Sequence, residues 1–91
     1  MARIKKHKKV LFQFKSEPGR QVFLAGSFNG WDPTCTPLRA SEDAGLYAVS
    51  LDLPKGRHEY KFVVDGQWQV DPACDESVLN DTGSLNSVLT V

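Results

Sequence analysis

The chain has 91 residues, enough for one domain with a two-layer hydrophobic core but too few for a deep catalytic cavity as well. Eleven Lys and Arg residues balance eleven Asp and Glu residues, and the zero net charge excludes an overall field that would attract nucleic acid or a membrane surface. No apolar segment has the length needed to cross a bilayer.

The chain begins with a basic arm at residues 1–9, which carries five cationic side chains: Arg3, Lys5, Lys6, Lys8 and Lys9. We favour a flexible, solvated terminus for this arm. A phosphate-contacting arm is the alternative, and it predicts nucleic-acid binding that weakens steeply with salt. The apolar run that follows, Val10-Leu11-Phe12, ends at Gln13 and is too short for a signal peptide, so the cytoplasm is the expected compartment.

From residue 10 onward, apolar residues alternate with polar ones and are interrupted by Gly, Pro, Asn and Asp, which is typical of antiparallel sheets. The alternation predicts strands at residues 10–14, 22–25, 47–53, 60–64, 67–70 and 89–91. No window has a sustained helical period. The pattern predicts one module, residues 10–91, with an all-β, immunoglobulin-like antiparallel β-sandwich fold, and a small barrel is the alternative.

The aromatic residues divide into two groups by their position. Five alternate with polar residues on predicted strands and are expected in the core: Phe12, Phe14, Tyr47, Tyr60 and Phe62. Trp31 and Trp68 instead lie beside turns, among polar neighbours. Each indole is either a cap over the end of the sandwich or an exposed recognition surface, and the pattern leaves both interpretations open.

The hairpin around Asp65-Gly66 relates two of these side chains to each other. A two-residue turn at this pair places Trp68 opposite Val63, so Lys61 lies on the same sheet face as Trp68, about 7–8 Å away on the diagonal. Such a face suits a pyranose, whose C–H groups stack on an indole and whose hydroxyls need donors and acceptors. Taken alone, Lys61 is most simply a solvated lysine on an exposed sheet face.

Three blocks of sequence carry a resemblance to a known family: Val22–Trp31 (VFLAGSFNGW), Pro54–Trp68 (PKGRHEYKFVVDGQW) and Asp71-Pro72. Together they resemble the family 48 carbohydrate-binding module. That family includes the glycogen-binding domain of AMP-activated protein kinase β subunits and the N-terminal module of isoamylases and branching enzymes. The resemblance extends over about residues 10–91 and implies an immunoglobulin-like sandwich of the early-set type that binds α-1,4-linked glucose chains. It also implies that Trp31 and Trp68 are stacking platforms and that Lys61 donates to sugar hydroxyls.

The resemblance continues into a late loop, where the family reads Leu-Gly-Thr-x-Asn and this chain reads Thr82-Gly83-Ser84-Leu85-Asn86. Asn86 matches and is expected to bond sugar hydroxyls, and Ser84 keeps the hydroxyl of the threonine it replaces. Thr82 replaces a leucine that projects into the curve of the bound glucan in the kinase-subunit domains. Because threonine presents less apolar surface, we expect weaker binding or a different preference among chain shapes.

Six carboxylates could be imagined as the acid pair of a glycosidase: Asp32, Asp65, Asp71, Asp75, Glu76 and Asp81. That chemistry needs two carboxyl groups facing each other across a cleft, one of them with a raised pKa. The hairpin explains Asp65, while Asp32 and Asp71 precede prolines as turn residues. We therefore expect no catalytic residue and no cofactor.

The two cysteines occupy similar positions, each in an Asp-Pro-x-Cys stretch after a Trp-containing loop. The family arrangement makes these loops neighbours, so a disulfide between Cys35 and Cys74 that clamps the sugar site is one hypothesis. Free thiols are the favoured interpretation, because no export signal is present. With His7 and His58, the cysteines lack the ligand spacing of a zinc site, and no metal is expected.

The expected function is therefore non-catalytic binding of an α-glucan polysaccharide or maltooligosaccharide, such as glycogen or starch, which localises a partner enzyme of glycogen metabolism or a kinase. The rival function is a protein-interaction or regulatory scaffold of the same fold that has lost sugar binding. Neither a membrane nor nucleic acid is an expected partner.

Overall fold

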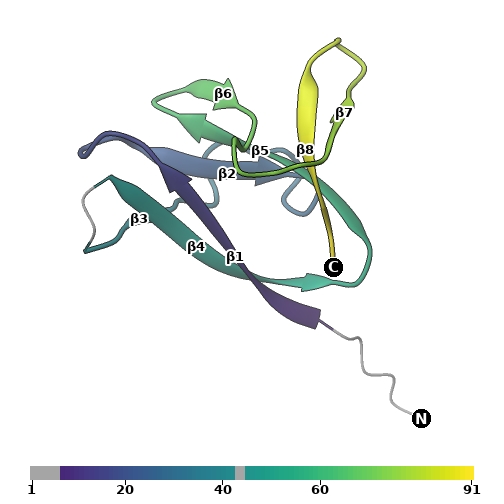
Figure 1. The fold of residues 1–91 in the computed structure, drawn as a ribbon, viewed down its shortest axis with the longest axis horizontal. Helices are drawn as coiled ribbons and strands as arrows, with labels where there is room; N and C mark the ends of the chain where they lie inside the picture. Colours follow the sequence, from purple (N-terminus) through teal and green to yellow (C-terminus); the bar gives the residue numbers. More distant parts are fainter. Residues whose placement is uncertain (1–6, 43–44) are drawn as a thin grey trace.

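The computed structural model describes residues 7–42 and 45–91, which form eight strands in two antiparallel sheets (Figure 1). No helix occurs in these described ranges. The all-β, immunoglobulin-like sandwich expected from the alternation is therefore confirmed. Each sheet buries one face, because alternate side chains of a strand point to opposite sides.

The first sheet is built around a long central strand. Its strands are, in spatial order, β1 (His7–Lys15), β4 (Leu46–Pro54) and β3 (Arg39–Ala40). Phe12 and Phe14 of β1 pair with Val49 and Tyr47 of β4, and the side chains of Phe12, Phe14 and Tyr47 are buried. The sequence placed the start of the module at residue 10. The ladder reaches further, since residues 7–9, which were expected in the basic arm, already pair with β4; residues 1–6 of that arm lie outside the described residues.

The second sheet is organised by β5, which pairs with different partners along its length. Its strands are β2 (Val22–Gly26), β5 (Arg57–Val64), β6 (Gln67–Gln69), β7 (Ser77–Leu79) and β8 (Leu85–Thr90). One edge of β5 pairs with β2, while the other edge pairs first with β8, up to Tyr60, and then with β6, from Phe62 onward. Lys61 therefore lies at the junction where the neighbour of β5 changes from β8 to β6.

The strand predictions agree with most of this topology. The segments expected at residues 10–14, 22–25, 47–53 and 60–64 lie within β1, β2, β4 and β5, and the segment expected at 67–70 overlaps β6. The last strand was expected at residues 89–91 but spans Leu85–Thr90, and the alternation missed its start because Asn86 and Ser87 are polar although buried. The short strands β3 and β7 were not predicted.

The core lies between the two sheets and contains all five aromatic residues expected there. Phe62 is fully buried, and its ring centroid lies 4.7 Å from that of Phe14 of the opposite sheet. The Phe12 and Tyr60 rings meet edge to face at 5.0 Å. These ring pairs join β1 to β5 and hold the strand that carries Lys61 against the first sheet.

Gly26, at the end of β2, allows a close approach that a larger residue would block. A methyl group at this position would lie 2.6 Å from the Glu59 carbonyl oxygen and 2.7 Å from the Phe28 ring. We expect Gly26→Ala to lower the free energy of unfolding by about 1–3 kcal/mol, because β5 backbone must shift to remove the overlap. Urea unfolding measures this loss, and an unchanged midpoint would contradict the close contact.

Candidate functional site

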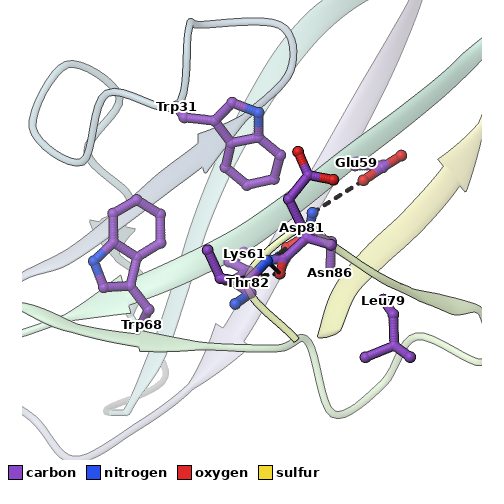
Figure 2. Close-up of a pocket in the computed structure, with 9 residues that line it drawn as sticks. Trp31, Glu59, Lys61, Trp68, Leu79, Asp81, Thr82 and Asn86 are labelled. Carbon is purple, nitrogen blue, oxygen red and sulfur yellow. Dashed lines mark hydrogen bonds between the residues drawn. The ribbon is translucent and has the colours of Figure 1, made fainter. Parts of the chain in front are cut away.

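A pocket of about 510 Å³ opens on the outer face of the second sheet (Figure 2). Three segments meet around it: the loop after β2, the β5–β6 hairpin and the loop between β7 and β8. Its lining residues are Trp31, Glu59, Lys61, Trp68, Leu79, Asn80, Asp81, Thr82 and Asn86. Five of the six residues expected to bind sugar therefore share one pocket, while Ser84 is exposed and lies outside its lining.

Trp31 reaches the pocket through a tight loop that begins at Gly26. The Gly26 carbonyl accepts hydrogen bonds from the backbone N–H groups of Asn29 and Trp31, at 3.1 and 2.9 Å. The Asn29 side chain completes the loop by accepting from the Gly26 N–H and donating to the Leu24 carbonyl. Trp31 itself has a φ of 60°, a left-handed conformation that is costly for a bulky residue. The loop therefore holds the backbone in a strained state that places the indole beside the pocket.

Trp68 and Lys61 lie on the same face of the sheet, as the hairpin at Asp65-Gly66 predicts. Asp65 and Gly66 both have positive φ values, 49° and 84°, as a type I′ turn requires, and Trp68 pairs with Val63. The Trp68 side chain is 46% exposed. Lys61 lines the same pocket as both indoles, and Figure 2 shows it below Trp31 and to the right of Trp68. Neither indole is enclosed in the core, which favours the exposed-surface interpretation over a cap.

The loop between β7 and β8 is organised by Asn80, a residue that the sequence analysis did not single out. Its Oδ1 accepts hydrogen bonds from the Thr82 N–H, the Thr82 hydroxyl and the Ser84 N–H, at 3.0, 2.8 and 3.0 Å. An Asn followed by Asp-Thr-Gly is a typical signal for such a turn, so the sequence could have revealed it. Because the Thr82 hydroxyl donates its one proton within the loop, Thr82 can offer a ligand only its methyl group and an acceptor oxygen.

Asn86 links this loop to the central strand and is only 5% exposed. Its Oδ1 accepts from the Asn80 amide at 3.2 Å, and its Nδ2 donates to Glu59 Oε1 at 3.0 Å. Glu59 also accepts from Arg57, at 3.2 Å. The amide of Asn86 is thus largely engaged by protein groups, and Glu59, which the sequence analysis missed, brings a fixed carboxylate to the pocket.

Three of the six carboxylates considered for glycosidase chemistry, Asp32, Asp65 and Asp71, have structural partners. Asp32 accepts from the backbone N–H and the hydroxyl of Thr34, and these bonds lower its pKa. Asp71 accepts the Tyr60 hydroxyl at 2.7 Å. Both carboxylates whose pKa departs from the ordinary value, Asp32 and Asp65, are shifted downward, which is opposite to the shift a proton donor requires.

Asp65 makes the stability of the hairpin dependent on pH. Its carboxylate accepts from Arg20 at 2.8 Å and from the Gln21 N–H at 3.0 Å, and these bonds lower its pKa in the folded state. The stabilisation is therefore present above the unfolded pKa and is lost as pH falls through the folded pKa. Asp65→Asn keeps a residue suited to the turn but removes the charge.

We expect Asp65→Asn to be less stable than the natural chain at about pH 7, and the difference to shrink as the pH falls to about 2 and Asp65 takes up a proton. Urea unfolding midpoints of both proteins at the two pH values measure it. A difference that stays constant on acidification would show that the carboxylate charge contributes nothing.

Cys35 and Cys74 are free thiols. Cys35 is exposed, whereas the half-buried Cys74 Sγ donates to the Val88 carbonyl at 3.2 Å. In residues 7–42 and 45–91 no group of three or more His, Cys, Asp or Glu side chains is placed to hold a metal ion. The same ranges contain no helix that is long and apolar enough to span a membrane.

Comparison with known proteins identifies the family. Residues 8–91 match the family model described as the glycogen recognition site of AMP-activated protein kinase. The chain belongs to this family. It is 41% identical over 76 residues to mouse (Mus musculus) 5'-AMP-activated protein kinase subunit beta-2, which covers 84% of this chain and 27% of that protein. It is 42% identical over 73 residues to subunit beta-1 of Sus scrofa, which covers 80% of this chain and 56% of that protein.

The bovine (Bos taurus) subunit beta-1 is 44% identical over 73 residues, or 80% of this chain and 25% of that protein. The chain thus spans only about a quarter of the length of most of these relatives. Membership in the glycogen-recognition family confirms the resemblance inferred from the three sequence blocks. It makes this chain a glycogen-binding module, and the module itself is non-catalytic.

Proposed function

We propose that this glycogen-recognition module holds an α-1,4-linked glucan chain by stacking glucose rings on Trp31 and Trp68. The observation that supports this proposal is the convergence of both indoles and the Lys61 ammonium on one open pocket, although the three residues come from different parts of the chain. An indole offers a flat apolar surface to the C–H face of a pyranose, and a donor beside it satisfies the hydroxyls at the rim.

Lys61 is proposed to donate to sugar hydroxyls from its position at the junction of β6 and β8. Asn86 has one N–H left after its bond to Glu59 and contributes that donor. Thr82 presents its methyl group, because its hydroxyl donates to Asn80. Ser84 lies outside the pocket lining, and its proposed contact requires a sugar chain that continues past the loop.

The proposed role of this binding is localisation, in which the module keeps an attached or associated enzyme or kinase on glycogen or a starch-like polymer. A shallow, open site should bind one short oligosaccharide weakly, with a Kd of about 0.01–1 mM. A polymer presents many overlapping sites and so increases capture by rebinding. The cytoplasm is the proposed compartment, because its reducing conditions maintain free thiols such as Cys35 and Cys74.

Tryptophan fluorescence during titration with maltoheptaose tests this function. The natural chain should show a quench or blue shift that saturates, since both Trp residues of the chain line the pocket. A β-1,4-linked glucose oligomer of similar length is the matched control, because its extended shape presents the rings differently. An unchanged spectrum up to millimolar maltoheptaose would favour the rival function, a scaffold that has lost sugar binding.

A further inference from the structure

The pocket extends beyond the two indoles to an exposed leucine. Leu79, the last residue of β7, is 65% exposed and lines the pocket. Figure 2 shows it on the far side from Trp68, with Lys61 and Thr82 between them. An exposed leucine alone is common on protein surfaces, but this one borders a pocket that has polar groups next to it.

The Glu59 carboxylate lines the same pocket as Leu79. Glu59 and Lys61 are two residues apart on β5, so their side chains point to the same face of the sheet. Arg57 and Asn86 each donate one hydrogen bond to Glu59, at 3.2 and 3.0 Å, and fix its orientation. A carboxylate has about four acceptor positions, so two bonds leave it able to accept further donors.

We propose that Leu79 and Glu59 form an additional glucose subsite, which binds a unit of the glucan chain beyond those that stack on the indoles. Leu79 covers C–H groups of this glucose, and Glu59 accepts a hydrogen bond from one of its hydroxyls. The subsite rests on the proposed function, since it extends the same pocket. It makes affinity depend on chain length, because only a glucan long enough to pass Lys61 reaches Leu79.

The β7–β8 hairpin supplies a matched control for this subsite. Leu85 of β8 pairs directly with Leu79 of β7, so both side chains lie on the same face of the hairpin. Leu85 is also exposed, at 45%, but it lies outside the pocket lining. Leu79→Ser and Leu85→Ser therefore make the same chemical change at paired positions, of which only one contacts the pocket.

The test compares the affinities of these variants for maltotriose and maltoheptaose by fluorescence titration. Leu79→Ser should weaken maltoheptaose binding roughly three- to tenfold, as expected for the loss of a partly buried apolar contact, and leave maltotriose binding unchanged. Leu85→Ser should change neither affinity. Leu79→Met, which keeps an apolar side chain, should restore most of the loss. Glu59→Gln should weaken maltoheptaose binding about fivefold, because a neutral amide is the weaker acceptor.

Equal affinities of Leu79→Ser and the natural chain for maltoheptaose would overturn the subsite. Equal weakening by Leu79→Ser and Leu85→Ser would also overturn it, because the effect would then come from the hairpin itself. A failure of the proposed function looks different, since the natural chain would then bind neither oligosaccharide.

Discussion

The double variant Trp31→Gly/Trp68→Ala should bind maltoheptaose at least a hundredfold more weakly than the natural chain. Each stacked indole is expected to contribute about 1.5–3 kcal/mol, and the two together exceed the roughly 2.8 kcal/mol, or two factors of ten, that this loss requires. Glycine is chosen at position 31 because the backbone there is left-handed, with a φ of 60°. Isothermal titration calorimetry measures the effect without depending on the indoles as reporters.

The stability of the same double variant shows whether the two indoles serve to bind a ligand or to cap the end of the sandwich. Glycine relieves a left-handed strain of about 1–2 kcal/mol, which offsets the loss of the packing that the Trp31 ring provides. Trp68 is nearly half exposed, so its removal should cost little. We expect the free energy of unfolding to stay within about 1 kcal/mol of the natural value. A loss of several kcal/mol would instead identify the indoles as caps over the end of the sandwich.

Phe62→Ala should lower the free energy of unfolding by about 3–5 kcal/mol, the usual cost of deleting a buried phenyl ring, which is about a fifth or more of the stability of a domain of this size. Phe62 is fully buried, and its ring contacts Phe14 at 4.7 Å and Tyr60 at 5.8 Å between ring centroids. Urea unfolding of the variant measures the loss. Phe62→Leu is the control, since a smaller change of volume should cost about half as much or less.

A loss below about 1 kcal/mol for Phe62→Ala would contradict the central place of this ring in the core. The variant should also weaken maltoheptaose binding in proportion to the population that unfolds, because Lys61 and Glu59 lie on the same strand. Maltoheptaose binding that persists in an unfolded Phe62→Ala protein would show that binding does not require the folded pocket.

The sequence predicted the long strands well because their apolar residues alternate strictly. The alternation in β1, β4 and most of β5 matches strands of which one face is buried, while Phe62, Val63 and Val64 at the end of β5 are all buried. It fails at the start of β8, where Asn86 and Ser87 are buried. Asn86 forms hydrogen bonds with Asn80 and Glu59, and the Ser87 hydroxyl accepts from the Asp71 N–H. Such partners are distant in sequence, so a local pattern has no means of predicting a buried polar strand.

The candidate site was predictable where local geometry determines it. The Asp65-Gly66 turn sets the register that brings Lys61 and Trp68 to one face, and the structure has this register. Trp31 comes from another loop, and its place beside them was implied only by the family resemblance. Leu79 and Asp81 were not predicted, because the β7–β8 loop reaches the pocket through tertiary packing. Glu59 could have been found from its position two residues before Lys61.

The hydrogen bonds that run from Arg57 through Glu59 and Asn86 to Asn80 have a consequence for the speed of recognition. They fasten the β7–β8 loop to the central strand before any ligand arrives. A β7–β8 loop that is already ordered loses little conformational entropy when the ligand binds and needs no closing motion. Association should therefore be fast, and the modest affinity should arise from quick release. A module of this kind would move readily from one outer chain to the next on a branched particle.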